Sequence, residues 1–245
     1  MALIHQFERT GNWLFKRRSW LPVILVVSGI TVLYLVNRQA IIFDMRDELI
    51  FLAVSLLGEL IRVLTIGFTP KNTSGRNTGQ GQVADELNTK GIYSIVRHPL
   101  YVGNFFMWLG PVLFLRSVWF IIIFCLAYWL YYERIMFAEE QFLRRKFGDA
   151  YDKWSETVAA FFPLKFNYKP ANLQFSLKNV LKREYNSFGN IFLIFLILDL
   201  FRNYFLSGRV YVTELWIYLS AGAAVIWITV RLIHKKTRWL QVEGR

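Results

Sequence analysis

The sequence has 245 residues, of which 55% are apolar and 18% aromatic, and its formal net charge at pH 7 is +12. This apolar content, together with a positive mean hydropathy, excludes an ordinary soluble domain. The charge does not require nucleic acid as a partner, because basic residues beside a membrane attract anionic headgroups and fix the topology of the chain. Composition therefore indicates a membrane protein that binds no nucleic acid.

The apolar residues are clustered in six stretches along the chain. A helix needs about 20 residues to cross the hydrocarbon layer, and only helices or closed barrels satisfy their backbone groups in lipid. The stretches lack the short alternating pattern of barrel strands. We therefore predict an all-α, polytopic transmembrane helix bundle of about six spans, the third and fourth forming a tight hairpin. The stretches are residues 20–36, 49–68, 101–115, 118–132, 188–201 and 215–233.

Lys and Arg are concentrated before the first stretch, between the second and third, between the fourth and fifth, and after the sixth. Loops rich in basic residues tend to stay in the cytoplasm. We therefore predict a multi-pass integral membrane protein with both termini on the cytoplasmic side. The first stretch has no small-residue cleavage pattern after it, which favours a retained span over a signal peptide.

Polar residues divide the chain into three regions. We predict part of an N-terminal transmembrane pair at residues 1–58, a core with the hairpin at 59–165, and a linker with a C-terminal transmembrane pair at 166–245. Residues 69–82 form a glycine-containing polar loop suited to wrapping a ligand, but no strand pattern marks it as a dinucleotide fingerprint. One cysteine and three scattered histidines predict no metal site.

The segment GIYSIVRHPLYVGNFF, residues 91–106, has the features of a helix start at the membrane surface. Pro99 is tolerated in the first turn of a helix, and His98 stands near the cap. The free amides of such a helix end, with Arg97 beside them, can receive a carboxylate or phosphate. From the residues alone, a cap with Arg, His and Tyr anchors at the interface is an equally good interpretation.

A second polar segment, residues 131–154, continues the fourth apolar stretch as a helix. At 100° per residue, Glu139 falls within an apolar stripe and therefore points at the protein. This position predicts either a ligand role or an ion pair with an interior partner such as Arg97. Glu140 falls on the flank, where the i, i+4 spacing predicts a solvated pair with Arg144.

Arg62 interrupts the second stretch, where a charge is costly without a partner. Glu59, one turn earlier, is the nearest candidate. We favour a structural ion pair between them over a role in binding an acceptor.

The two segments together resemble the signature of the isoprenylcysteine carboxyl methyltransferases and their phospholipid methyltransferase relatives. The pattern is GxYxxxRHPxYxG, then EExxLxxxFGxxY, then a proline. The matching residues are Gly91, Tyr93, Arg97, His98, Pro99, Tyr101, Gly103, Glu139, Glu140, Leu143, Phe147, Gly148, Tyr151 and Pro163.

This resemblance implies an enzyme that binds S-adenosyl-L-methionine in a cofactor pocket of helices and loops on the cytoplasmic side. Membrane lipids would surround it, and a lipophilic methyl acceptor would arrive from the bilayer. A cationic sulfonium and an aromatic adenosine suit carboxylates, tyrosines and a helix N-terminus. The resemblance implies catalytic roles for Glu139, Arg97 and Arg76. It implies cofactor binding by Tyr93, His98, Pro99, Tyr101, Gly103, Glu139 and Glu140.

One departure from the family pattern leaves the acceptor open. Carboxyl methyltransferases of the family carry an Arg near the end of the motif region, but residues 155–163 read SETVAAFFP. A lipid amine or a lipid phosphate is therefore as good a candidate as a carboxylate, with Arg76 and Lys165 as possible cations on the acceptor side. Oligomeric state is left open.

Two other functions remain as alternatives. NADPH-dependent sterol or steroid reductases show a similar RHPxYxG element, and a non-catalytic membrane protein could share the scaffold. The reductases typically continue with Asp after the glycine and carry an Asp-Glu pair, whereas this chain has Asn104 and the pair Glu139 and Glu140. Both differences favour methyl transfer.

Overall fold

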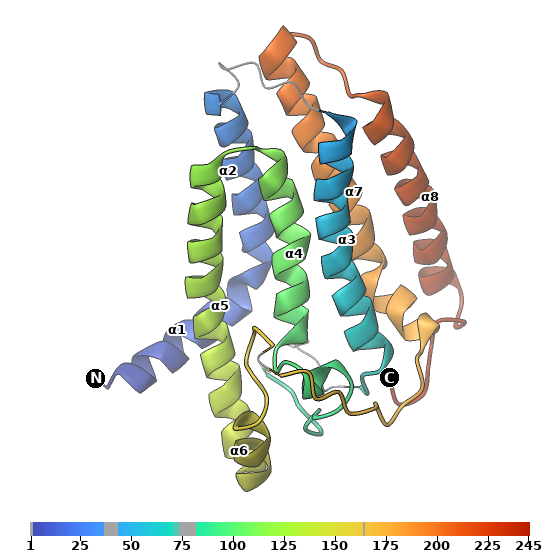
Figure 1. Cartoon of the computed structure of the whole chain (residues 1–245). Coiled ribbons are helices and arrows are strands. Elements are labelled where there is room, and N and C mark those ends of the chain that lie inside the picture. Colours follow the sequence, from blue (N-terminus) through green and yellow to red (C-terminus); the bar gives the residue numbers. More distant parts are fainter. Residues whose placement is uncertain (1, 37–43, 72, 74–81, 164) are drawn as a thin grey trace.

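The structure is a computed structural model that describes residues 2–36, 44–71, 73, 82–163 and 165–245. Its helices stand side by side in one bundle, and shorter elements and loops gather at the lower end of Figure 1. In chain order the elements are α1 (Leu3–Arg17), η1 (Arg18–Trp20), α2 (Leu21–Val36), α3 (Met45–Gly67), η3 (Ile92–Ser94), α4 (Pro99–Phe114), α5 (Val118–Phe147), α6 (Asp149–Ser155), α7 (Leu177–Ser207) and α8 (Glu214–Lys236).

Each of the six predicted stretches is helical, and the polytopic helical bundle is confirmed. Within the described residues, five helical segments are long and apolar enough to cross a membrane: Leu3–Leu35, Met45–Gly67, Val118–Phe147, Leu177–Ser207 and Glu214–Lys236. The sixth, α4, has 16 residues. At 1.5 Å per residue it is about 24 Å long, less than the ~30 Å hydrocarbon layer.

The tight hairpin of α4 and α5 is present as predicted. Arg116 adopts a left-handed conformation with φ of 50°, and the Ser117 side chain caps α5 by accepting from the Phe120 amide at 3.3 Å. Arg116 also forms an ion pair with Asp47 at the start of α3. The loop is thereby fixed to the neighbouring helix.

Helices α3 and α4 approach each other closely because glycines line their contact. A Cβ at Gly58 would lie 2.4 Å from the carbonyl oxygen of Gly103, and one at Gly103 would lie 2.6 Å from Cγ of Arg62. Small residues at a helix contact let backbones approach in lipid, where packing is the main attraction between helices. This contact fixes Arg62 beside the first turns of α4.

Helix α7 begins eleven residues before the predicted apolar stretch, at Leu177. The Ser176 side chain caps it by accepting from the Asn179 amide at 3.3 Å, and Nδ2 of Asn179 donates to the Ile66 carbonyl at 2.9 Å. The apolar stretch alone does not reveal this polar first part. It carries Glu184 into the bundle.

The upper end of the bundle is held by a buried ionic cluster. Arg202 of α7 donates to Glu48 of α3 at 2.5 Å and pairs with Asp199, while Nε1 of Trp216 in α8 donates to Glu48 at 2.6 Å. All four side chains are buried. Because buried charges need partners, this cluster fixes α7 and α8 to α3.

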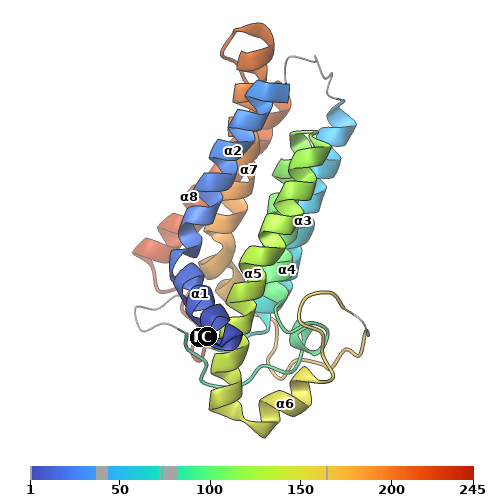
Figure 2. The same cartoon turned by 90° about the vertical axis from the view of Figure 1, so that its left-hand side faces the viewer.

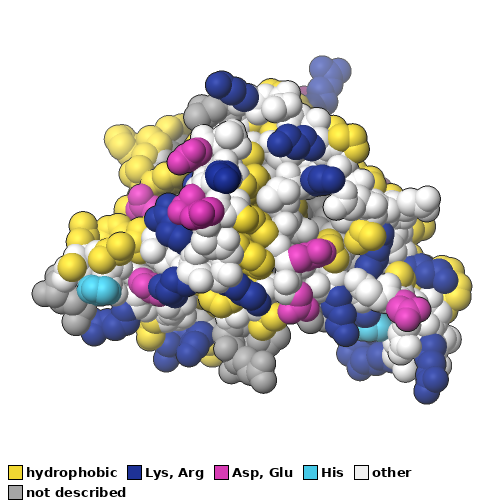
Figure 3. All heavy atoms as spheres, turned by 90° about the horizontal axis from the view of Figure 1, so that it is seen from below, with side chains coloured by type: hydrophobic (Ala, Val, Ile, Leu, Met, Phe, Trp, Pro, Cys, Tyr) yellow, Lys and Arg dark blue, Asp and Glu magenta, His cyan; other side chains and the backbone are white. Residues whose placement is uncertain are grey.

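Both chain ends lie at the lower end of the bundle in Figure 1. The tail after α8 folds back beneath α3, where Arg245 donates to the Gly67 carbonyl at 2.7 Å. Helix α1 leaves the bundle at an angle and packs against α5 (Figure 2). Seen from below, Lys and Arg side chains are spread over this end (Figure 3). Which face of the membrane this end occupies, and the division at residues 1–58, 59–165 and 166–245, stay predictions.

Candidate functional site

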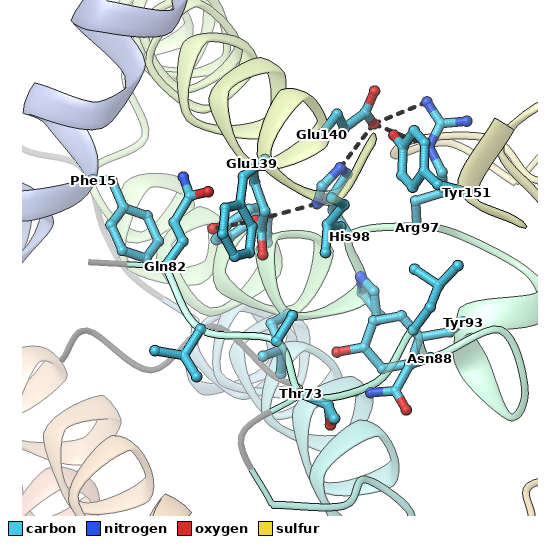
Figure 4. A pocket seen from close by; sticks show the side chains of 18 of the residues that line it. Phe15, Thr73, Gln82, Asn88, Tyr93, Arg97, His98, Glu139, Glu140 and Tyr151 are labelled. Carbon is cyan, nitrogen blue, oxygen red and sulfur yellow. Dashed lines mark hydrogen bonds and ion pairs between the residues drawn. The ribbon is translucent and has the colours of Figure 1, made fainter. Parts of the chain in front are cut away.

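A polar cavity of about 260 Å³ opens at the lower end of the bundle. The start of α4, the extension of α5, the loop around η3, and α6 form its walls, and side chains from α1 and η1 complete it (Figure 4). Its polar and aromatic lining residues are Phe15, Arg18, Arg62, Thr73, Gln82, Glu86, Asn88, Tyr93, Arg97, His98, Tyr101, Asn104, Tyr132, Glu139, Glu140, Phe142, Tyr151, Trp154 and Arg183.

The local sequence explains why α4 begins in this cavity. Pro99 stands at its first position and His98 is the N-cap residue, as predicted. The preceding backbone is tied to the segment after α6, because the amides of Arg97 and His98 donate to the carbonyls of Ala159 and Ala160 at 2.8 and 3.1 Å. Long-range backbone bonds thus hold the motif at the cavity wall.

His98 lies between the two carboxylates of α5 (Figure 4). Its Nε2 is 2.9 Å from Oε1 of Glu140, and its Nδ1 is 3.6 Å from Oε2 of Glu139. Burial opposes the charge on His98, but hydrogen bonds and ion pairs with Glu139 and Glu140 raise the pKa of His98 to about 9. At neutral pH the ring is therefore an imidazolium that compensates both carboxylates.

The two carboxylates have different further partners. Glu140 also accepts from Nε of Arg97 at 3.0 Å and forms an ion pair with Nη2 at 2.9 Å, so two cations compensate it. Glu139 instead accepts from the neutral hydroxyl of Tyr101 at 2.9 Å. The carboxylate of Glu139 is the less fully compensated of the pair.

Two predicted side-chain pairs are wrong. Arg97 pairs with Glu140 and not with Glu139. Arg144 pairs with Asp152 of α6 at 2.7 Å and leaves Glu140 to the cavity. The helical stripe did not separate the carboxylates, because their side chains are 21% and 23% exposed and both line the same cavity.

Arg97 is held by carbonyl groups as well as by Glu140. Its Nη1 donates to the Ser155 and Val158 carbonyls at 2.7 and 2.5 Å. Because three of the five guanidinium N–H groups donate in these bonds and the one to Glu140, Arg97 fixes the segment after α6. Its predicted catalytic role stays a prediction.

Aromatic residues form the remaining walls. Burial, with Glu139 nearby, raises the pKa of the Tyr93 hydroxyl, and burial, with Glu140 nearby, raises that of Tyr151. Both phenols therefore stay neutral over the physiological range. Nε1 of Trp154 donates to the Tyr93 carbonyl at 3.2 Å and joins α6 to the loop around η3.

Most of the predicted site residues line this one cavity, namely Tyr93, Arg97, His98, Pro99, Tyr101, Glu139 and Glu140. Gly103 instead lies in the contact between α3 and α4, outside the lining. Arg76 lies outside the described residues. The roles of all these residues in binding and catalysis stay predictions.

A second, more apolar cavity of about 540 Å³ lies between α2, α4 and α7. Val23, Val27 and Leu193 in its lining are also exposed on the outer surface, so the cavity reaches the face that a membrane would cover. Four residues line both cavities and define what we call the junction: Arg18, Arg62, Asn104 and Tyr132.

The junction depends on Arg62, for which the sequence suggested a different partner. Nε and Nη2 of Arg62 donate to the two oxygens of Glu184 at 2.8 Å each, and Nη1 donates to Oδ1 of Asn104 at 2.7 Å. Among the described residues, the ion-pair partner of Arg62 is Glu184 and not Glu59, so that predicted partner is wrong. The early start of α7 is the reason, since it brings a better-placed carboxylate to the guanidinium.

Asn104 and Tyr132 complete the junction. Nδ2 of Asn104 lies 3.4 Å from the Tyr132 hydroxyl, and the ring of Tyr132 lies 4.8 Å from that of Tyr101 and 4.3 Å from that of Tyr128. In the sequence, Asn104 distinguishes the families, but no local pattern marks Asn104, Tyr132 or Arg18 as a site residue. Their positions relative to the motif follow from packing between helices that are distant in the sequence.

Fold and site together define a membrane-embedded helical protein in which a polar cavity at one end of the bundle meets a lipid-accessible one. Residues 49–150 match the family described as phospholipid methyltransferase. That match contains α4, α5 and the paired carboxylates. The chain belongs to the family of isoprenylcysteine and phospholipid methyltransferases.

Individual relatives agree with this assignment. The chain is 39% identical over 79 residues to the protein-S-isoprenylcysteine O-methyltransferase of Schizosaccharomyces pombe, covering 32% of this chain and 33% of that protein. It is 30% identical over 118 residues to the protein-S-isoprenylcysteine O-methyltransferase of Tribolium castaneum, covering 48% and 42%. The chain thus spans less than half the length of these two relatives.

A third relative has a different kind of name. The nickel-cobalt-cadmium resistance protein NccN of Alcaligenes xylosoxydans xylosoxydans is 30% identical over 151 residues, covering 61% of this chain and 67% of that protein. No solved structure matches the chain.

Proposed function

We propose that this protein is a methyltransferase that uses S-adenosyl-L-methionine to methylate a lipid or another lipophilic acceptor. The observation that carries the proposal is the junction, where a polar cavity with two partly buried carboxylates meets an apolar cavity open to the outer surface. A polar donor and a membrane-dissolved acceptor need such an arrangement, because the donor arrives from water and the acceptor arrives from the bilayer. Family membership supports the same reaction class.

The residues of the polar cavity fit this cofactor. When bound, it supplies an electrophilic methyl group on a cationic sulfonium. Glu139 would hold cationic parts of the cofactor, and the N-terminal end of α4 would receive its carboxylate. Nδ2 of Asn88 is buried in the cavity lining with no hydrogen-bond partner among the described residues, and such a donor suits an acceptor atom of a ligand.

The aromatic residues would bind the apolar parts of the cofactor. Tyr93, Tyr151 and Trp154 present rings to the cavity, and aromatic rings suit an adenine or a sulfonium. His98 keeps both carboxylates in place through its imidazolium. Methyl transfer needs little beyond positioning and the exclusion of water, which these walls provide.

The orientation is part of the proposal. Both chain ends lie at the cavity end of the bundle, and Lys and Arg side chains are spread over that end. By the excess of basic residues in cytoplasmic loops, this end faces the cytoplasm. The cavity would then open to the compartment where a soluble donor is available, with membrane lipids around the bundle.

Ligand binding to purified protein tests the proposal. We expect S-adenosylhomocysteine to bind the protein in nanodiscs in isothermal titration, and NADPH not to bind. Glu139→Gln should weaken binding, while Glu133→Gln, a neighbour on α5 outside the cavity lining, should not. Binding of NADPH alone would favour a reductase, and binding of neither ligand to folded protein would overturn the enzymatic assignment.

A further inference from the structure

We propose that Arg18 and Arg62 form a head-group site at the junction, and that the acceptor is an amphiphile with an anionic oxygen head, a carboxylate or a phosphate. This inference rests on the proposed methyltransferase function and names its substrate class. It also supplies cations where the motif region, residues 155–163, lacks an arginine.

The charged side chains of the second cavity are all basic among the described residues. Among the described residues that line it, the charged ones are Arg18 and Arg62. The other polar side chains there are neutral: Ser19, Asn104, Tyr132, Ser187 and Asn190. An ammonium head in this cavity would meet two guanidinium groups and no carboxylate of the described lining, whereas an anionic head would meet opposite charges.

The guanidinium of Arg62 is held in a fixed orientation and still has N–H groups for a ligand. Three of its five N–H groups donate to Glu184 and Asn104, which fixes the plane of the guanidinium. One N–H on Nη1 and one on Nη2 remain beyond these bonds. Because Arg62 lines both cavities, oxygen atoms of a ligand at the junction can accept from these groups.

Arg18 is the second arginine of the junction. It follows α1 in η1, and its guanidinium carbon lies 4.2 Å over the ring of Phe15, a buried residue of the polar cavity. The two arginines come from different elements of the bundle. A head placed between them would lie at the boundary with the cofactor cavity.

The number of protons that the acceptor must lose on methylation also favours an anionic oxygen head. An anionic oxygen forms the new O–CH₃ bond with a lone pair while the C–S bond of the sulfonium breaks and its electron pair stays on sulfur, so no proton has to leave. An ammonium would first have to lose a proton. Among the described residues lining the second cavity, no carboxylate or histidine is present to take it, and in the adjoining polar cavity Glu139, Glu140 and His98 are already paired with one another.

The test uses three photoactivatable amphiphiles with one chain and a carboxylate, phosphate monoester or primary amine head. Each is titrated against the protein in phosphatidylcholine nanodiscs, and labelling is measured by intact mass and mapped to α2, α4 and α7. We expect half-saturation of both anionic compounds at concentrations about tenfold lower than that of the amine. The two anionic arms distinguish carboxylate from phosphate.

Arg17 offers a matched control for Arg18. Its guanidinium carbon lies 4.4 Å over the ring of Trp13, but the residue lines neither cavity. We expect Arg18→Gln to reduce the preference for anionic heads several-fold and Arg17→Gln to leave it unchanged. For the other arginine, Arg62→Gln combined with Glu184→Gln removes a cation and its counter-ion together, so that no buried charge is left unpaired.

The outcomes separate this inference from the proposed function. Equal or tighter labelling by the amine, or equal effects of Arg17→Gln and Arg18→Gln, would overturn the head-group site. Thermal unfolding and monodispersity are measured on every variant as a check on folding, and S-adenosylhomocysteine binding is measured separately. If wild-type protein shows the arginine-dependent preference but does not bind S-adenosylhomocysteine, the head-group site stands and the proposed methyltransferase function fails.

Discussion

Arg62 and Glu184 form a two-point ion pair inside the bundle, with Nε and Nη2 of the arginine each 2.8 Å from a carboxylate oxygen. The two residues are 122 positions apart in the sequence. Their pairing joins α3 to α7 at the boundary between the two cavities. The same ion pair therefore stabilises the fold and defines where donor and acceptor would meet.

Removing one partner of this pair should lower stability more than removing both. Arg62→Met leaves the buried carboxylate of Glu184 without its cation, which typically costs about 3–5 kcal/mol. The combination with Glu184→Met should recover much of that loss. Thermal unfolding in detergent, followed by tryptophan fluorescence, measures both. Equal midpoints for the single and double variants would contradict a structural role for the pair.

The two carboxylates of α5 should differ in their effect on the cofactor. Glu140 is compensated by His98 and Arg97, whereas Glu139 has the neutral Tyr101 hydroxyl as its second partner. We therefore expect Glu139→Gln to weaken S-adenosylhomocysteine binding about ten- to a hundredfold, as the loss of a charge-assisted hydrogen bond implies.

The matched change Glu140→Gln should weaken S-adenosylhomocysteine binding less than Glu139→Gln does. It should lower thermal stability more, because it leaves Arg97 without its carboxylate. Isothermal titration and thermal unfolding of the two variants, each checked for monodispersity, give the comparison. A larger loss of binding for Glu140→Gln would make Glu140 the cofactor ligand.

Protonation of His98 should make stability depend on pH above neutrality. Its folded-state pKa of about 9 is higher than the ordinary value of 6.5, so its ion pairs contribute fully below about pH 6.5 and are lost as pH rises through 9. Melting temperatures should therefore fall between pH 7 and about pH 9.5. His98→Gln should show a lower melting temperature at pH 7 and a flatter profile. A wild-type profile as flat as that of the variant would contradict a charged His98.

Cysteine labelling tests the orientation of the bundle. In a Cys125→Ser background, cysteines placed at Lys71 and Lys169, at the cavity end, should resist a membrane-impermeant thiol reagent in intact cells. A cysteine at Arg209, in the loop between α7 and α8, should react. All three positions are exposed in the structure. The opposite pattern would place the cavity on the outer side, away from a cytosolic donor.

The sequence by itself determined the features that depend on neighbouring residues. Runs of apolar residues determined the helices, because a span must satisfy its backbone within one segment. Pro99 and His98 determined where α4 begins, since a missing N–H costs nothing at that position. The motif residues brought the family into view, and most of them line one cavity.

Only the tertiary structure decided which charges meet. Helical spacing predicted a pair of Glu140 with Arg144. In the structure, Glu140 pairs with His98, and Arg144 pairs with Asp152. Spacing likewise offered Glu59 to Arg62, whereas the polar first part of α7 supplied Glu184. A buried charge takes the partner with the best geometry from any element packed against it, and that choice depends on helix contacts between segments far apart in the sequence.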